Sequence, residues 1–294
     1  MFYRRKLILA LLQAFGGNLE KINLQKLLFL LCSRQQAPEY EFVPYLYGCY
    51  SHSAKADLVT MTKKEILLED QVSYYKKDKK DYLSALKESD RLLVNQIYVQ
   101  YHKMDGHDLM RYTYVHFPYY AINSSVAKDL LTKNQIEKIV SERPHVEGYI
   151  LYTIGYEGIS LESYLNKLIK SDIRVLVDVR NNPISQKFGF SKPLLMRYCA
   201  SLNIEYMHYP EVGIQSAFRQ ELKTQADYDN LFEEYKDQTL TRTLSIQQSI
   251  LNLLTEKQRI ALTCFEANIN QCHRKHLAES ICHLPTWQYE LKHI

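Results

Sequence analysis

The sequence lacks long apolar runs: the longest are the sextets LILALL at residues 7–12 and LLFLLC at residues 27–32. A membrane-spanning helix needs about 20 such residues, so we expect no membrane partner. Cysteine is also scarce, with six among 294 residues. This scarcity excludes a disulfide-stabilised scaffold and predicts a reducing, cytoplasmic location.

The basic residues Arg4, Arg5 and Lys6 in front of LILALL imitate a secretory signal. The apolar run is short and a helical pattern resumes in NLQKLLFLL, so we expect the mature chain to start at Met1. No internal repeat is present. The one low-complexity run, KKDKKD at residues 76–81, predicts a solvated turn, with nucleic-acid contact as the alternative.

The composition is that of a globular protein, with 46% hydrophobic and 24% charged residues. At roughly 100 to 200 residues per domain, the length predicts two domains, residues 1–146 and 147–294. The formal net charge is +4, and all of it lies before residue 151. This charge fits either an anionic partner or plain solubility.

The N-terminal domain is predicted to be α-rich, because its apolar residues recur at three- and four-residue spacing. The order helix, helix, strand pair favours a winged-helix-like arrangement. The expected elements are helices at residues 2–15 and 22–35, a helix capped by Ser51 and running through Lys64, a hairpin at residues 66–77, and helices near residues 83–102 and 127–141.

In the C-terminal domain, short apolar strands alternate with amphipathic helices. The strands are YTIGY, RVLVDVR, IEYMHYP and RIALTCFE. This alternation predicts an α/β fold with a mostly parallel sheet and helices on both faces. Ligands bind beyond the carboxyl ends of such strands, and the polar residues cluster there.

The strand exits supply the candidate functional residues. Gly155, Tyr156 and Glu157 form either a phosphate cradle or a tight turn. Asp178 and Arg180 lie on one side of the second strand, where they either pair with each other or leave Arg180 to receive an anion. The third strand ends near His208 and Glu211, and the histidine is either titratable or structural. The fourth strand and its loop add Cys264, Glu266, Cys272, His273 and Arg274.

The cluster after the fourth strand offers a nucleophile, a general acid or base, and an anion clamp. Zinc is the alternative, because Cys264, Cys272 and His273 are ligand types. The seven residues between the two cysteines match no common zinc motif, and adjacent Cys272 and His273 are not expected to converge on one ion. We therefore expect no metal and no other cofactor. A regulatory disulfide between the two cysteines stays open.

Four motifs together resemble the bacterial family called domain of unknown function 488. They are TIGY at residues 153–156, DVRNNPISQKFGFSK at 178–192, IEYMHYPEVGI at 204–214 and CFEANINQCHR at 264–274. The resemblance covers about residues 149–283 and implies an α/β sandwich, but no reaction. Members often have Ser-Arg where this chain has Ser185 and Gln186.

The resemblance to the 488 family also implies a functional crevice. The implied crevice holds Asp178, Arg180, Glu266, Cys272, His273 and Arg274, and the second motif adds Asn182, Ser185, Phe190 and Lys192.

Rhodanese-like sulfurtransferases are a further, weaker likeness. They share the strand ending DVR and a cysteine that ends a later strand, but their compact active loop is absent from this sequence.

INLQKLLFLLCSRQ and PYLYGCYS resemble the Panacea antitoxin-like domains, with Cys49 in place of a proline. This resemblance implies toxin neutralisation or phage defence, and therefore a protein or nucleic-acid partner for the N-terminal domain.

The first functional hypothesis is an enzyme acting on a nucleotide or nucleic acid. Arg180 and Arg274 would hold a phosphate, Glu266 or His273 would move a proton, and Cys264 or Cys272 would be the nucleophile. The alternatives are a non-catalytic, nucleotide-sensing regulator that grips DNA or a protein, and a rhodanese-like thiol enzyme. A homodimer stays open.

Overall fold

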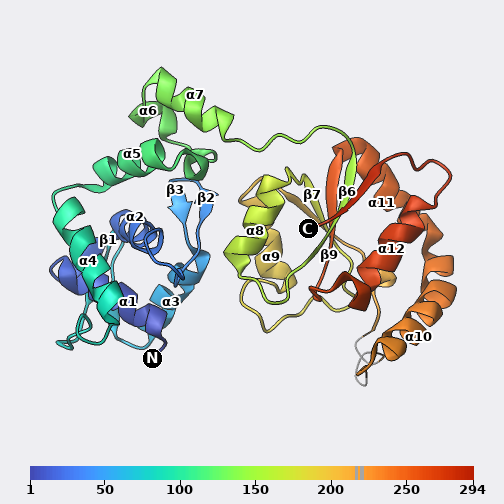
Figure 1. Ribbon diagram of the computed structural model, residues 1–294, viewed down its shortest axis with the longest axis horizontal. Helices are drawn as coiled ribbons and strands as arrows, with labels where there is room; N and C mark the ends of the chain where they lie inside the picture. The colour runs from blue at the N-terminus through green and yellow to red at the C-terminus, as the bar shows by residue number, and fades with distance from the viewer. Residues whose placement is uncertain (216–217, 219–221) are drawn as a thin grey trace. The chain divides into compact units, whose positions relative to one another are not determined.

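The computed structural model describes residues 1–215, 218 and 222–294 (Figure 1). The chain forms two compact units, Met1–Arg143 and Pro144–Ile294. The boundary inferred from the sequence, after residue 146, lies close to this division. Among the described residues, no helix combines the length and the apolar character that crossing a bilayer requires.

The N-terminal unit is rich in helices, as the sequence predicts. It combines a three-stranded antiparallel sheet of order β1-β5-β4 with a separate β2-β3 hairpin. Its elements are α1 (Tyr3–Ala14), β1 (Asn18–Glu20), α2 (Lys21–Cys32), β2 (Val43–Tyr45), β3 (Gly48–Tyr50), α3 (His52–Lys63), β4 (Leu67–Glu69), β5 (Ser73–Lys76), α4 (Glu88–Tyr101), α5 (Gly106–His116), η1 (Pro118–Ala121), α6 (Ala127–Leu130) and α7 (Lys133–Ser141).

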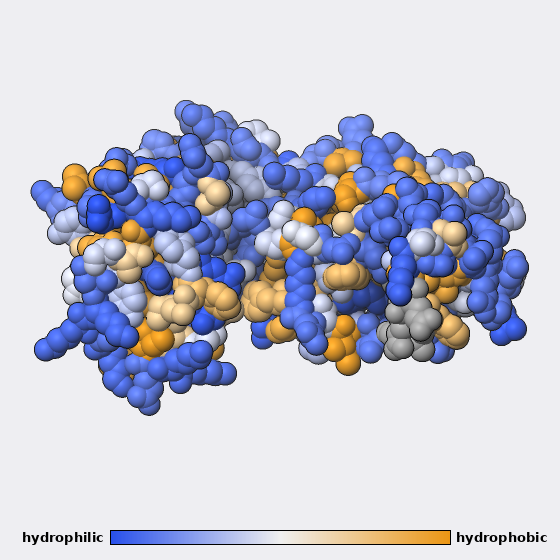
Figure 2. Space-filling view, turned by 60° about the horizontal axis from the view of Figure 1, so that its bottom comes forward, coloured by the Kyte–Doolittle hydropathy of each residue, from blue (hydrophilic) through white to orange (hydrophobic). Residues whose placement is uncertain are grey.

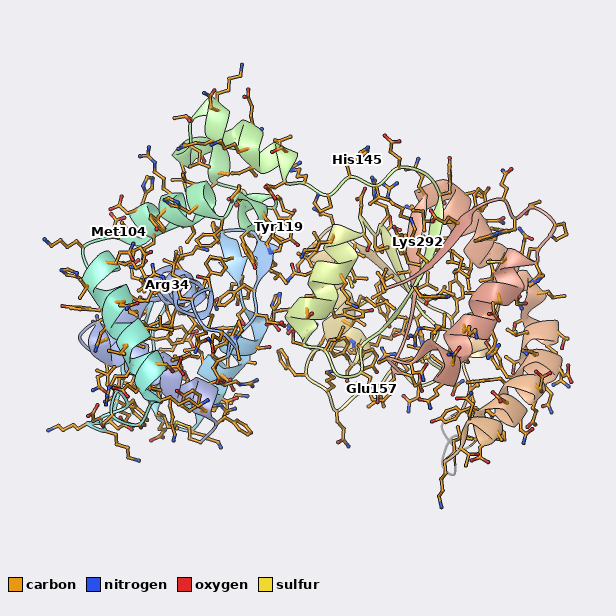
Figure 3. All side chains as sticks on the ribbon, viewed as in Figure 1. Arg34, Met104, Tyr119, His145, Glu157 and Lys292 are labelled. Carbon is orange, nitrogen blue, oxygen red and sulfur yellow. The ribbon has the colours of Figure 1, made fainter. Side chains whose placement is uncertain are left out.

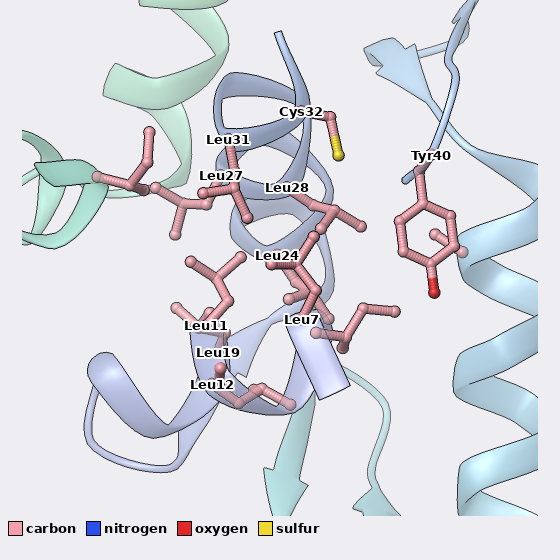
Figure 4. Packing of buried hydrophobic residues seen from close by; sticks show 14 of the residues in the cluster. Leu7, Leu11, Leu12, Leu19, Leu24, Leu27, Leu28, Leu31, Cys32 and Tyr40 are labelled. Atoms are coloured by element: carbon pink, nitrogen blue, oxygen red, sulfur yellow. The ribbon is translucent and has the colours of Figure 1, made fainter. Parts of the chain in front are cut away.

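The core of this unit is built on the two apolar sextets. All six residues of LILALL, Leu7 to Leu12, are fully buried in α1, and LLFLLC is buried in α2. Figure 4 shows leucines of the two helices packed together, with Tyr40 beside them. Helices this apolar on all sides are stable only when neighbouring elements enclose them, so the surrounding helices and the small sheet complete the fold.

Local signals set several boundaries in this unit. The Ser51 hydroxyl accepts a hydrogen bond from the Ala54 amide at 3.1 Å, which confirms the predicted cap of α3. The predicted hairpin is present as β4 and β5. The helix predicted at residues 127–141 is wrong in one respect, because it is divided into α6 and α7. Thr132 and Gln135 form a capping box at the division and start a new helix there.

The C-terminal unit is the predicted α/β fold. All strands of its five-stranded sheet run parallel in the order β10-β6-β9-β7-β8. Helices cover both faces, with α8 and α9 on one and α11 and α12 on the other (Figure 1). Its elements are β6 (Ile150–Gly155), α8 (Leu161–Lys170), β7 (Val175–Asp178), α9 (Lys192–Ala200), β8 (Glu205–His208), η2 (Pro210–Val212), α10 (Gln225–Tyr235), the π-helix η4 (Lys236–Leu240), η5 (Thr241–Thr243), α11 (Leu244–Lys257), β9 (Arg259–Cys264), η6 (Ile269–Gln271), α12 (His273–Cys282) and β10 (Glu290–His293).

The central strands β7 and β9 are buried along their whole length, as expected of parallel strands covered on both faces. The four strands predicted from the sequence are β6, β7, β8 and β9. The fifth, β10, is an addition at one edge. The face shown in Figure 2 is mostly hydrophilic, with scattered apolar residues.

Candidate active site

The carboxyl ends of four strands bring the predicted residues to one edge of the sheet. In the register of the strands, Gly155 is paired with Cys264, and Asp178 is paired with both Thr263 and His208. Segments more than 100 residues apart in the sequence, around Gly155 and Cys264, therefore end side by side. This placement is the one that a parallel sheet predicts.

A pocket of about 360 Å³ opens at this edge. Its walls come from the loops after β6, β7 and β9 and from the first turn of α12. The sequence missed several lining residues, among them Asn181, Gln186 and Phe265, which carry no signal beyond their place in the exit loops. The predicted residues that line the pocket are Tyr156, Arg180, Asn182, Ser185, Cys264, Glu266 and His273.

Asp178 and Arg180 form a buried ion pair, of which Arg180 lines the pocket. Asp178 is fully buried and Arg180 is 6% exposed. The Arg180 Nε donates to both Asp178 carboxylate oxygens, at 2.8 and 3.1 Å, and Nη2 donates to Oδ2. Nη1 donates to the Tyr156 hydroxyl at 2.7 Å and to the Phe190 carbonyl at 2.9 Å. Of the two predicted alternatives, the structure thus shows the one in which the residues pair.

Arg274 is also committed to the protein. It is 2% exposed, and its guanidinium donates to the carbonyl oxygens of Glu266 and Ala267 in the loop before α12. The loop passes so close to β6 that a Cβ on Gly155 would clash with the backbone carbonyl oxygen of Glu266. Arg274 therefore stabilises the loop that carries Glu266, and it is not among the described residues that line the pocket.

Cys264 lies between a carboxylate and an imidazole. Its Sγ is 3.2 Å from Glu266 Oε2 and 3.7 Å from His273 Nδ1. The other ring nitrogen of His273, Nε2, lies 2.9 Å from the Val179 carbonyl oxygen. Because a carbonyl only accepts, Nε2 must carry the ring hydrogen, and the lone pair of the neutral ring is then on Nδ1. The imidazole is therefore held as a proton acceptor facing the thiol.

Cys272 lies behind this pair and is fully buried. Burial, followed by the neighbouring Cys264, raises the pKa of the Cys272 thiol well above its usual value. The Cys264, Cys272 and His273 ligand atoms all lie within 4.8 Å of one another. None of the six described cysteines forms a disulfide. The expectation that Cys272 and His273 would not converge is thus wrong, because Cys272 has an extended backbone, φ −133° and ψ 130°, immediately before α12 begins.

Part of the C-terminal unit matches a known protein family. Residues 160–281, called the DUF488 region below, match the model of the domain of unknown function DUF488. The C-terminal unit resembles this family, as the sequence motifs predict. No curated protein matches the chain. The DUF488 match contains the motifs that begin at Asp178, Ile204 and Cys264, and the TIGY motif at β6 precedes it.

The remaining predicted residues of the DUF488 region surround the pocket without lining it. His208 Nε2 lies 2.8 Å from the Arg180 carbonyl oxygen, and its Nδ1 lies 3.1 Å from Lys192 Nζ. Phe190 is fully buried and stacks on Tyr156 with ring centroids 4.2 Å apart. Both sets of contacts fix the walls of the pocket.

Two predicted carboxylates lie at the periphery. Glu157 is exposed on the loop after β6 (Figure 3), and its Oε2 accepts a hydrogen bond from the Ala267 amide at 2.9 Å. This contact ties the loop after β6 to the loop after β9. Glu211 lines a neighbouring cavity of about 430 Å³, which shares Asn181 and Ile214 with the pocket. Glu211 therefore lies in the cavity beside the pocket, and not among the described residues that line the pocket.

Proposed function

We propose that the DUF488 region is a thiol-dependent enzyme in which Cys264 is the nucleophile and His273 accepts its proton. The observation that carries this proposal is the position of Cys264 Sγ in the pocket wall, 3.7 Å from an imidazole nitrogen whose tautomer is fixed by the Val179 carbonyl. A thiol is activated by an adjacent general base whose orientation is set by a third group. The three residues meet this description.

The reaction proceeds by transfer of the thiol proton to Nδ1 of His273. Cys264 Sγ then forms a bond to an electrophilic atom of the substrate, and the leaving group departs with the proton held by His273. The hydrogen bond from Nε2 to the Val179 carbonyl stabilises the imidazolium formed on the way. Glu266, whose Oε2 is the nearer acceptor of the thiol hydrogen, offers a second place for this proton.

The pocket favours a small polar substrate over a phosphate. Asn181, Asn182, Ser185 and Gln186, whose side chains carry amides and a hydroxyl, line the cavity. Among the described lining residues Arg180 is the one permanent cation, and Asp178 neutralises it. Asparagine and glutamine recognise the edges of bases by paired hydrogen bonds, so a nucleotide substrate stays a prediction in which the base, and not the phosphate, enters the pocket.

The non-catalytic alternative depends on the N-terminal unit. The winged-helix interpretation, and with it an antitoxin-like role in phage defence, stays a prediction. Its support is the order of α1, β1, α2, α3 and the β4-β5 hairpin. The charge of the hairpin does not favour DNA contact, because Glu69 binds the ammonium groups of Lys21 at 2.8 Å and Lys55 at 3.1 Å. Because these pairs neutralise the lysines, a protein partner for the N-terminal unit is favoured over DNA.

Alkylation with iodoacetamide tests the catalytic thiol without knowledge of the substrate. In the full-length chain at neutral pH, after treatment with a chelator, we expect Cys264 to be labelled faster than Cys282, as measured by peptide mass spectrometry over time. Cys282 is the matched control: it is more exposed, but burial raises its pKa to about 11. Accessibility alone predicts the opposite order.

Replacing the base separates activation from accessibility. The change His273→Asn is expected to slow the labelling of Cys264 by about 100-fold, the lower end of general-base effects, and to leave Cys282 unchanged. Fluorescence of Trp287, the one tryptophan of the chain, checks that the unit is folded. Labelling of Cys264 at or below the rate of Cys282 in the wild type would show that Cys264 is not an activated nucleophile.

A further inference from the structure

We propose that Cys264, Cys272 and His273 form a binding site for a soft divalent cation such as Zn²⁺, and that the bound cation switches the thiol chemistry off. The metal site rests on its own geometry. The regulatory effect rests on the proposed function, since it requires a reactive Cys264.

The spacing of the ligand atoms matches a tetrahedral zinc site. With Zn–S near 2.3 Å and Zn–N near 2.1 Å, tetrahedral angles place sulfur and nitrogen ligands about 3.6 Å apart. Cys264 Sγ and His273 Nδ1 are 3.7 Å apart, and Cys272 lies within the same 4.8 Å set. The Cys264–His273 distance therefore already fits such a site, and the Cys272 thiol lies close enough to complete it by a side-chain rotation.

The surroundings of His273 are those of a metal ligand. A ligating histidine usually donates its second ring N–H to a carbonyl or carboxylate, which orients the ring and fixes the tautomer. The bond from Nε2 to the Val179 carbonyl, 2.9 Å long, does both. His273 is 1% exposed and Tyr235 packs edge-on against its ring, so the ring is also fixed by packing.

The donor set selects the class of cation. Two sulfur ligands and one imidazole favour zinc and similar soft cations, whereas Mg²⁺ and Ca²⁺ need several oxygen ligands. The fourth position can be taken by Glu266, whose Oε2 is 3.2 Å from Cys264 Sγ, or by a group entering from the pocket. Binding through the two thiols releases both of their protons.

The same geometry explains why binding would inhibit. The cation takes the sulfur lone pair of Cys264 that attacks a substrate, and it takes the Nδ1 lone pair of His273 that accepts the proton. Cys272 has no part in the proposed reaction. A change at Cys272 therefore separates metal binding from the thiol reaction, because it removes a metal ligand and leaves the nucleophile and the base in place.

Zinc binding is tested on the full-length chain after dialysis against a chelator. The variants are Cys272→Ser, immediately before α12, and, as a matched control at the other end of that helix, Cys282→Ser. After Zn²⁺ is added back and the excess is removed, we expect the wild type and Cys282→Ser to take up one Zn²⁺ per chain by elemental analysis. Cys272→Ser, which loses one ligand, should bind at least about 10-fold more weakly. We also expect Zn²⁺ to slow alkylation of Cys264 in the wild type and in Cys282→Ser, but not in Cys272→Ser.

Substitution with Co²⁺ keeps the test decisive if Cys272→Ser does not fold. In the wild type, Co²⁺ bound by the two thiols gives a sulfur-to-metal charge-transfer band in the near ultraviolet, which histidine or carboxylate sites lack. The absence of Zn²⁺ uptake, unchanged affinity in folded Cys272→Ser, or Co²⁺ binding without this band would each overturn the metal site. Zinc uptake with an unreactive Cys264 in the metal-free protein would instead overturn the proposed enzyme and leave the metal site standing.

Discussion

The buried pair of Asp178 and Arg180 makes a sharp prediction about stability. The change Asp178→Asn keeps the size of the side chain but removes the charge that compensates the guanidinium. Arg180 is 6% exposed, so water does not replace the lost partner. Breaking a buried ion pair from one side costs about 3–5 kcal/mol. We expect the free energy of unfolding of the C-terminal unit to fall by about that amount, a large part of the 5–15 kcal/mol typical of a domain.

The matched control is a pair at the surface of the same unit. Lys257 and Glu205 are 2.6 Å apart, but their side chains are 27% and 57% exposed. Exposed pairs contribute less than about 1 kcal/mol, so Glu205→Gln should change the free energy of unfolding by no more than this. The contrast between the two carboxyl-to-amide changes isolates the effect of burial.

Urea unfolding followed by Trp287 fluorescence measures both variants, because this tryptophan packs against the core of the C-terminal unit. A double-mutant cycle with Arg180→Met completes the test. The double variant leaves no lone charge, so its cost should be well below the sum of the single costs. A loss below about 1 kcal/mol for Asp178→Asn, or additive costs in the cycle, would refute the assignment of a buried, mutually compensating pair.

Two further predictions concern the β2-β3 hairpin of the N-terminal unit and the helix α12. Gly48→Ala should destabilise the N-terminal unit by about 1–3 kcal/mol, because the φ of Gly48 is +88° and a Cβ there would clash with the Tyr114 ring. Gly16→Ala is the control: its φ is +85°, but a Cβ would meet no neighbour, so this change should cost less. Unfolding followed by circular dichroism measures both variants. Burial, and then Lys236, lowers the pKa of His276. The folded state therefore binds its proton less readily than the unfolded chain, so stability should fall as the pH drops below about 6.5, and His276→Gln should reduce this slope in urea midpoints.

The central strands of the C-terminal sheet could be predicted from the sequence, but the edge strand β10 could not. Strands β7 and β9 are continuous apolar runs, because both of their faces are covered, and such runs are visible in a sequence. Strand β10 reads ELKH and is mostly exposed, and among the described strands it pairs with β6 alone. Its formation depends on pairing with β6, and not on any apolar pattern of its own.

Helix α5 was missed for a related reason. Its central residues, Tyr112, Thr113, Tyr114 and Val115, are aromatic or β-branched and have low intrinsic helix propensity. Packing of α5 against α2 and the cap supplied by Asp105 outweigh that preference. Propensity is a weak guide wherever tertiary contacts decide, and a single sequence does not contain those contacts.

The residues of the site were predictable, but their partners were not. Strand alternation places Asp178, Arg180 and Cys264 at one edge, whereas the chemistry depends on which groups bond to each other. A phosphate would have to displace Asp178 from Arg180, in a buried place where that carboxylate already holds the guanidinium by several hydrogen bonds. Charge counting alone would assign the anion site to the arginines. In the function proposed above, the reactive role therefore falls to the Cys264 thiol and the His273 imidazole, which lie 3.7 Å apart.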